Sequence, residues 1–149
     1  MRSVMVVASI LCIFVMSFSI SVQAAEPERV IVTVLSASNE GNDFNLENDA
    51  YKDKLIELFS YSAYEQLEQT SVELSRAERN TIALLENCEL VLTLQGTENG
   101  RIVVEAVIRK DHKEVVNTVI SILKPGAAFL GGPILQDEKA LILVLEAGY

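Results

Sequence analysis

The chain has 149 residues, and its 21 acidic side chains outnumber its 12 lysines and arginines, which gives a formal net charge of −9. A surface of this charge repels the phosphates of nucleic acids and of anionic lipid head groups. Composition therefore argues against nucleic-acid and peripheral membrane binding. It suits simple solubility, a cationic partner or a divalent metal.

The N-terminal sequence has the features of a secretory signal peptide. Residues 3–25 carry no charged side chain, Arg2 precedes them, and small residues end the run at Val22-Gln23-Ala24. This order predicts a signal peptide over residues 1–24, cleavage after Ala24, and a periplasmic or secreted mature domain over residues 25–149. An uncleaved anchor is the alternative, because about 20 apolar residues can cross a bilayer. The small residues at the end of the run favour cleavage.

Cleavage would remove Cys12 and leave Cys88 as the only cysteine of the mature chain. The mature domain then cannot form an intramolecular disulfide, so its core must be stable without one. The neighbouring carboxylates of Glu86 and Glu89 discourage thiolate formation at Cys88. We therefore expect a small, partly buried turn residue at this position, with a disulfide between two chains as the alternative.

The first element expected in the mature domain is a strand. Residues 30–35 are β-branched and apolar on both faces, which is typical of a strand covered on both sides. A polar loop over residues 36–46 follows, and Asn48 or Asp49 is placed to cap a helix. The apolar stripe of that helix, which we expect to pack on the sheet, contains Tyr51, Leu55, Leu58, Phe59 and Ala63.

Residues 61–85 are compatible with more than one structure. Residues 61–67 can continue the helix or begin an extended segment. Ser75-Arg76-Ala77-Glu78 matches a capping box at the start of a short helix. The alternation of Val72/Leu74 and Ile82/Leu84 instead predicts two short strands. We favour strands, because the sequence downstream has β-type patterns.

Three strands of an antiparallel meander are expected from residue 90 onward. Apolar side chains alternate over residues 90–94, 102–108 and 116–122, and the connections between these segments are too short for parallel crossovers. The third strand ends at Lys124-Pro125-Gly126. The meander is the clearest pattern in the chain.

The C-terminal part is expected to contain a short apolar segment and one more strand. Residues 128–130 lead to Gly131-Gly132-Pro133, where the glycines allow a sharp bend or a bulge. A phosphate-binding loop would instead need a helix after its glycines. Residues 140–145 are as continuously apolar as residues 30–35, and two such strands are best placed side by side at the centre of a sheet.

Together these elements predict a fold of the α+β class. One principal helix packs on a largely antiparallel sheet of about six strands. The sequence has no internal repeat, no low-complexity tract and no linker, so residues 25–149 are expected to form a single domain.

Two sets of titratable residues are candidates for catalysis, and neither meets its requirements. His112 is the only histidine and directly follows Asp111, but neighbouring residues on a turn rarely form a catalytic triad, so a solvated hairpin tip is expected. Glu105 and Glu146 could act as acid and base if they shared a cleft. The solvated face of a strand is the expected place of Glu105. We therefore assign no catalytic and no cofactor-binding residue.

The loop from Asn39 to Asp49 concentrates oxygen ligands of the kind that calcium prefers. Its spacing does not match an EF-hand, because with Gly41 at the sixth place the first ligand would be Ser36. A solvated loop that caps the helix is the expected structure, and we assign no metal ligand.

Three stretches of the chain carry a resemblance to a set of small uncharacterised exported bacterial proteins of unknown function. They are Tyr61-Ser62-Ala63-Tyr64-Glu65-Gln66-Leu67, the meander around Leu90 to Leu94, and Phe129-Leu130-Gly131-Gly132-Pro133 leading into Leu141-Ile142-Leu143-Val144-Leu145. The resemblance covers most of the mature chain and rests on hydrophobic spacing and one glycine-proline turn. It implies a signal peptide followed by an α+β domain, and it implies no activity and no site residues.

The sequence predicts a non-catalytic exported domain that acts as an interaction or accessory subunit for another envelope or secreted protein. A strand edge of the meander could accept a strand of the partner by β-augmentation. Charged residues such as Glu105 and Arg109 could instead discourage such pairing. The alternative function is binding of a small ligand or divalent cation by the acidic loop 39–49. Neither function involves nucleic acid, a cofactor or stable membrane association after cleavage.

Overall fold

The computed structural model describes residues 21, 25–47 and 49–148. The predicted signal peptide, residues 1–24, lies outside the described residues except for Ser21. In the described part, no helix has the length and apolar composition needed to cross a membrane.

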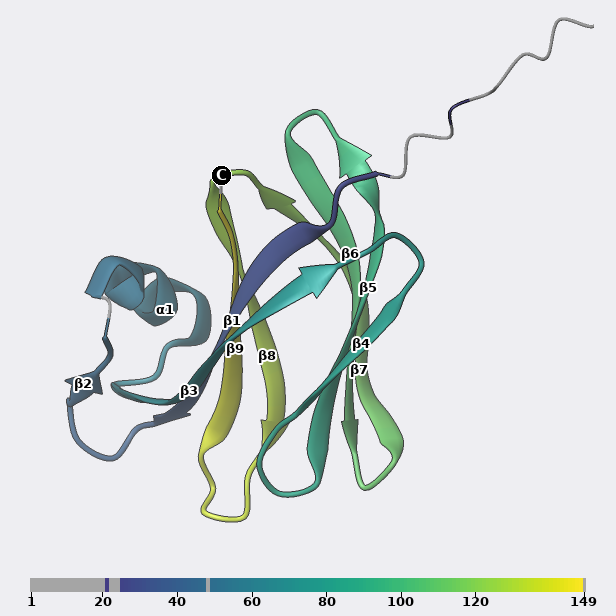
Figure 1. Ribbon diagram of the computed structural model, residues 1–149. Helices are drawn as coiled ribbons and strands as arrows, with labels where there is room; N and C mark the ends of the chain where they lie inside the picture. Colours follow the sequence, from purple (N-terminus) through teal and green to yellow (C-terminus); the bar gives the residue numbers. More distant parts are fainter. Residues whose placement is uncertain (1–20, 22–24, 48, 149) are drawn as a thin grey trace, which may run out of the picture.

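The described residues form two β-sheets and one short helical segment (Figure 1). In chain order the elements are β1 (Glu28–Ser38), β2 (Phe44–Asn45), η1 (Asp49–Tyr51), α1 (Lys52–Phe59), β3 (Ala63–Leu74), β4 (Arg79–Ala83), β5 (Cys88–Glu98), β6 (Arg101–Lys110), β7 (Lys113–Leu123), β8 (Gly126–Ile134) and β9 (Ala140–Ala147). The five-stranded sheet has the order β2-β3-β1-β9-β8, and the four-stranded sheet has the order β4-β5-β6-β7.

The two sheets pack face to face and enclose the larger hydrophobic core. Strand alternation directs every second side chain of each sheet to this inner face. The inner face of the five-stranded sheet contributes Val30, Val32, Val34, Leu141, Leu143 and Leu145. The four-stranded sheet contributes Leu90, Leu92, Leu94, Ile102, Val104, Ala106 and Ile108.

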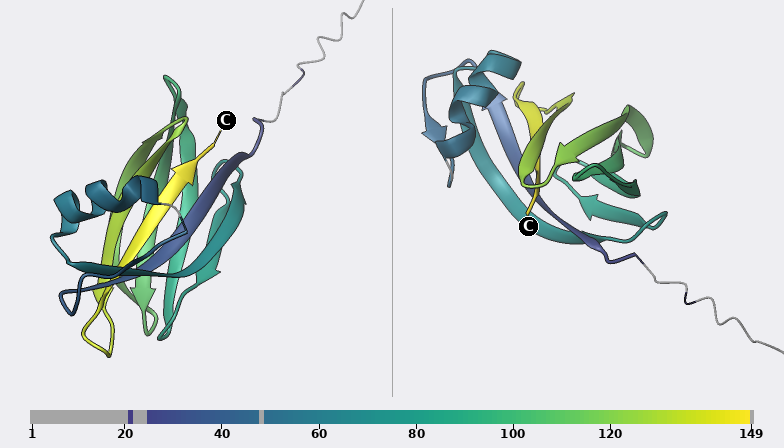
Figure 2. Two further views of the ribbon diagram at one scale, coloured as in Figure 1. Left: turned by 90° about the vertical axis from the view of Figure 1, so that its left-hand side faces the viewer. Right: turned by 90° about the horizontal axis from the view of Figure 1, so that it is seen from above.

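A second, smaller core lies on the outer face of the five-stranded sheet, under the helix. Leu55 of α1 is fully buried there against Leu35, Ile142 and Val144 of the two central strands. Figure 2 shows α1 lying across this outer face, opposite the four-stranded sheet. Strands β1 and β9 are therefore buried on both faces, because one face is covered by the second sheet and part of the other by the helix.

The pairing of β1 with β9 confirms the prediction made from their continuous apolar sequences. The two strands are antiparallel neighbours at the centre of the five-stranded sheet, with Val30 opposite Ala147 and Ala37 opposite Ala140. The meander is also confirmed, since β5, β6 and β7 pair antiparallel in sequence order.

The predicted α+β class is wrong, because the fold is a mostly β sandwich of two sheets. The expected principal helix is only eight residues long. It ends when Ser60 adopts a left-handed conformation with φ 57° and donates its N–H to the Ile56 carbonyl. The chain then becomes extended from Ala63, so that position belongs to β3 and not to the helical stripe. A second sheet, not a long helix, covers most of the apolar surface.

The start of the helix also differs from the prediction. Asn48 lies outside the described residues. Asp49 begins the 3₁₀ turn η1, and Tyr51 occupies the N-cap of α1 without a side-chain cap hydrogen bond. Of the predicted stripe, Leu55 is buried, whereas Leu58 is 47 % exposed. The short helix presents only a narrow stripe to the sheet.

Strands replace the capping box over residues 71–85, as favoured from the alternation. Val72 and Leu74 lie in β3, which pairs with β1, and Ile82 lies in β4, which pairs with β5. Ser75 does not begin a helix. Its carbonyl accepts the Glu78 N–H in a tight turn that carries the chain from one sheet to the other.

The predicted bulge at the paired glycines is confirmed in β8. Its register against β9 shifts between Gly131 and Ile134. A Cβ at Gly132 would lie only 3.2 Å from the Leu141 carbonyl oxygen. The close approach of two backbones therefore requires glycine at this position.

Candidate functional site

His112 stands at the tip of the β6–β7 hairpin. Asp111 and His112 both have positive φ, 51° and 65°, as the two central residues of a tight hairpin turn require. The Asp111 carboxylate accepts a hydrogen bond from the Asn87 amide at 3.3 Å. Asp111 is thus engaged with the neighbouring turn, and His112 is exposed as the sequence predicted.

Glu105 and Glu146 lie on opposite outer faces of the sandwich and cannot share a substrate. Glu105 sits between Val104 and Ala106, both of which face the inner core, so its own side chain faces outward from the four-stranded sheet. Glu146 follows the inward-facing Leu145 and points to the helix side of the other sheet. There it accepts a hydrogen bond from Tyr51.

Cys88 is more buried than the sequence predicted. It is the first residue of β5 and belongs to the inner core, with 3 % of its surface exposed. Burial raises the pKa of its thiol, which disfavours the reactive thiolate.

Hydrogen bonds connect the acidic loop 39–49 to the beginning of β3. The Ser62 hydroxyl donates to the Gly41 carbonyl at 2.6 Å, and the Ser62 N–H donates to Asn39 Oδ1 at 3.2 Å. The Tyr64 N–H donates to the Asp43 carbonyl at 2.9 Å, where β2 begins to pair in parallel with β3. These bonds hold the loop in a defined position at one end of the sheet.

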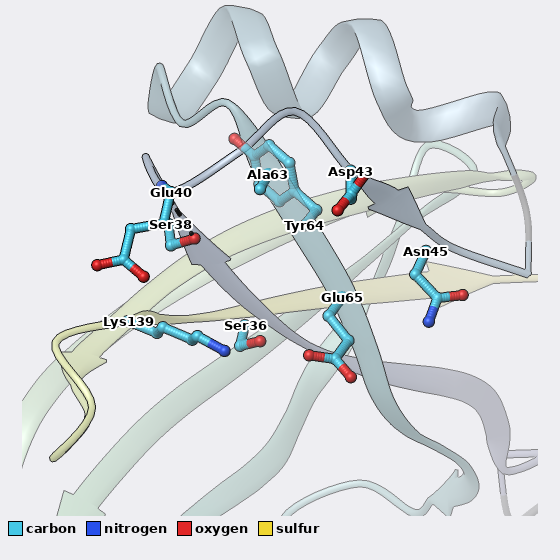
Figure 3. Close-up of a pocket in the computed structure, with 9 residues that line it drawn as sticks. All are labelled: Ser36, Ser38, Glu40, Asp43, Asn45, Ala63, Tyr64, Glu65 and Lys139. Carbon is cyan, nitrogen blue, oxygen red and sulfur yellow. Dashed lines mark hydrogen bonds between the residues drawn. The ribbon is translucent and has the colours of Figure 1, made fainter.

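A polar hollow of about 420 Å³ lies between this loop and the end of the five-stranded sheet (Figure 3). The loop contributes Glu40, Asp43 and Asn45. The remaining lining residues are Ser36, Ser38, Ala63, Tyr64, Glu65 and Lys139. Three carboxylates, one ammonium group, two serine hydroxyls and one amide therefore line one space.

Strand pairing brings the central polar side chains of the hollow into one row. Ser36 of β1 lies opposite Glu65 of β3, and Glu65 lies beside Asn45 of β2. Directly opposed side chains on one face have Cβ atoms about 4.5–5.5 Å apart. Lys139 comes from the turn before β9, and in Figure 3 its side chain extends toward Ser36.

The sequence did not predict four of the lining residues: Ser36, Ser38, Glu65 and Lys139. A signal for the two serines is present in β1, where the inward-facing positions change from Val30, Val32 and Val34 to Ser36 and Ser38. The change marks the point at which the inner face leaves the hydrophobic core. Glu65 and Lys139 have no comparable signal, because only strand pairing places them beside the serines.

The hollow has charged and polar groups that can bind a ligand. Lys139 Nζ lies 3.7 Å from the Asp137 carboxylate in a salt bridge, which is not the arrangement in which a lysine activates a serine. Within residues 21, 25–47 and 49–148, no three His, Cys, Asp or Glu side chains are grouped to hold a metal ion. The carboxylates of the loop line a broad hollow, and among the described residues they do not converge on one position that a metal ion could occupy.

The edge strand β7 forms a second candidate surface. Residues 115–123 of β7 contain no charged side chain. Val115, Val119 and Leu123 point outward from the four-stranded sheet and are 47 %, 61 % and 48 % exposed. Among the described strands, β6 is the one that pairs with β7, so no described strand is hydrogen-bonded to the opposite backbone edge of β7, while β8 of the other sheet lies near this strand. Long, apolar, uncharged edges are the ones that accept another strand.

The other edges of the sandwich are protected. Beyond the two residues that pair with β2, strand β3 carries Glu68 and Glu73, β4 has only five residues, and β8 contains Pro133. Charge, short length and proline are the usual means by which proteins prevent pairing at an edge.

No known protein family, no curated protein and no solved structure matches the chain. The resemblance to small exported bacterial proteins therefore stays a prediction.

Proposed function

We propose that this protein is a non-catalytic exported interaction domain that binds another envelope or secreted protein through the edge of β7. The observation that carries the proposal is the uncharged, open edge over residues 115–123, with three outward-facing apolar side chains. An extended partner segment can add to such an edge through main-chain hydrogen bonds, and side-chain pairing then gives specificity.

The charges that could have protected this edge lie one strand away from it. Glu105 and Arg109 belong to β6, which is covered on both sides by β5 and β7. Arg109 is occupied by Glu89 at 3.6 Å and by Glu114 at 3.8 Å. Of Glu89, Arg109 and Glu114, only Glu114 lies on β7, at the N-terminal end of that strand. The expected partner is an uncharged extended segment with apolar side chains at alternate positions, which would continue the row of Val115 and Val119.

The test is an affinity pull-down of the tagged mature protein from envelope and culture fractions, read by quantitative mass spectrometry. Val119→Lys places a charge on the outer face of the edge without changing the backbone. We expect it to reduce capture of a specific partner at least tenfold. The matched control is Leu67→Lys on β3, which alters a side chain that is 41 % exposed and should leave capture unchanged.

Three results would overturn the proposal. The partner could be retained by Val119→Lys, it could be lost equally with Leu67→Lys, or the wild-type bait could capture nothing. Size-exclusion chromatography of the purified protein covers a fourth outcome. If the wild type is a dimer that Val119→Lys dissociates, the occupant of the edge is a second copy and not another protein. Thermal unfolding of both variants verifies that they are folded.

A further inference from the structure

The hydroxyl of Ser36 lines the polar hollow without a hydrogen bond to the described protein atoms. Ser36 is only 4 % exposed, and no side-chain hydrogen bond among the described residues involves it. Its Oγ is still accessible from the hollow, because Asn80 Nδ2 is the one described side-chain atom that is both enclosed and unbonded. Figure 3 shows Ser36 among the residues that line the hollow. An accessible hydroxyl can both donate a hydrogen bond to and accept one from a molecule in the hollow. Ser36 Oγ therefore provides one hydrogen-bonding group to the occupant of the hollow.

Charges of both signs stand beside this hydroxyl. Glu65 is its cross-strand neighbour, Asp43 and Glu40 line the loop side, and Lys139 supplies the ammonium group. A metal ion would be repelled by the Lys139 ammonium group, which among the described residues pairs only with the exposed Asp137 carboxylate at 3.7 Å, and an anion would be repelled by the carboxylates of the hollow. A ligand with one positive and one negative end uses both.

We propose that the hollow binds a small zwitterion, such as a free amino acid or a dipeptide. Its ammonium group donates to the carboxylates of Glu65 and Asp43, and its carboxylate accepts from Lys139 and from the Ser36 hydroxyl. Such charge-assisted hydrogen bonds are stronger than bonds between neutral groups. This binding is independent of the β7 edge and goes beyond the function proposed above.

The size and construction of the hollow suit this ligand class. Its volume of about 420 Å³ falls within the range of roughly 300–1,000 Å³ that is usual for small-molecule sites. The bonds of Ser62 and Tyr64 to the loop place Asp43 before any ligand arrives. Such preorganisation reduces the entropy that binding must overcome.

The binding test uses the mature protein and isothermal titration calorimetry, with a thermal-shift screen to choose the probes. The probes are glycine, L-alanine, L-glutamine, L-lysine and glycylglycine, at concentrations up to about 10 mM, where binding as weak as millimolar is detected. We expect at least one of them to bind. Its amide, which lacks the carboxylate, and its N-acetyl derivative, which lacks the ammonium group, should each bind at least tenfold more weakly.

Substitutions test which protein side chains bind the carboxylate end of the ligand and which bind its ammonium end. Lys139→Met should weaken the zwitterion at least tenfold and leave its amide unaffected. Glu65→Gln should weaken the amide as well as the zwitterion, and Ser36→Ala should weaken the zwitterion. The matched control is Lys113→Met at the exposed β6–β7 turn, which should bind as the wild type does.

Each remaining outcome either contradicts the proposed site or identifies the source of its ligand. Absence of binding by every probe would mean that water alone occupies the hollow, and the proposal would be wrong. Thermal stabilisation by millimolar calcium without any zwitterion effect would also overturn it, in favour of a cation site. Binding by glycylglycine but by no free amino acid would retain the zwitterion and identify peptides as its source. The capture experiment with Val119→Lys tests the β7 edge alone, so its outcome neither supports nor contradicts the zwitterion site.

Discussion

At the scale of single residues, Tyr51 shows how one side chain joins the helix to the sheet. Its ring packs edge-on against Phe129 of β8, with ring centroids 5.5 Å apart. Its hydroxyl donates to Glu146 of β9. Burial and then this hydrogen bond raise the pKa of Tyr51 from 10.0 to about 12. The folded protein therefore holds the Tyr51 proton at pH values where the unfolded chain releases it.

This shift predicts a loss of stability at alkaline pH. The contribution is fully present below pH 10 and disappears as the pH rises toward about 12, because the unfolded chain then binds fewer protons than the folded protein. Urea unfolding of the wild type and of Tyr51→Phe, measured between these pH values, checks the expectation. The variant should lose less stability as the pH rises. Identical slopes for the two proteins would contradict the assignment to Tyr51.

Residue-scale chemistry was the least predictable part of the molecule from sequence. Ser36, Glu65 and Lys139 are far apart in the chain, and only the pairing of β1 with β3 and β9 places them at one end of the sheet. Conversely, the sequence offers Glu105 and Glu146 as a possible acid–base pair, because it does not show on which faces of the two sheets they lie. Strand alternation fixes which side chains share a face only when the partner strand is also known.

At the scale of elements, α1 depends on one side chain. Leu55 is fully buried in the outer core, and the hydroxyl of Tyr64 donates to the Leu55 carbonyl at 2.9 Å. A helix of eight residues is not stable alone in water. Its conformation is therefore maintained by packing against β1 and β9.

Two leucines of this helix should respond differently to truncation. Leu55→Ala leaves a cavity in the outer core, and we expect it to lower the free energy of unfolding by about 2–5 kcal/mol. Leu58→Ala changes a side chain that is 47 % exposed and should alter stability by no more than about 0.5 kcal/mol. Urea denaturation of both variants measures the difference. Similar losses would show that the helix is not anchored by its buried stripe.

The elements with clear alternation were predictable, and the ambiguous ones decided the fold. Strands β5, β6 and β7 followed directly from the pattern of Leu90 to Ile122. Residues 61–67 fit helix or strand, because Tyr64 and Leu67 are three positions apart, as on one face of a helix, whereas Tyr61 and Ala63 are two positions apart, as on one face of a strand. Tertiary pairing with β1 made this segment part of the 12-residue strand β3. That one assignment separates a helix-on-sheet fold from a sandwich.

At the scale of the whole molecule, the two hydrophobic cores share their central strands. Inner-face residues of β1 and β9 face the second sheet, and outer-face residues of the same strands face the helix. Neither core can be completed without both strands. The domain should therefore unfold as one cooperative unit.

Removal of β9 should abolish the fold completely. A chain that ends at Lys139 lacks the central neighbour of both β1 and β8, so we expect no cooperative thermal transition and no dispersed NMR spectrum. The control is a chain that begins at Glu28, without the exposed residues 25–27, which should unfold as the mature protein does. A cooperative transition in the shortened chain would show that the cores are separable.

The pairing of β1 with β9 also sets the order of events in the life of the chain. Val30 meets Ala147, a residue 117 positions further along. A contact of this sequence separation forms slowly, because the chain loses the entropy of a long loop before the contact contributes any stabilisation. During synthesis, β1 has no central partner until the ribosome has released β9. If the protein is exported as we propose, this delay keeps it in the unfolded form that a narrow translocation channel can pass, and folding is completed on the far side of the membrane.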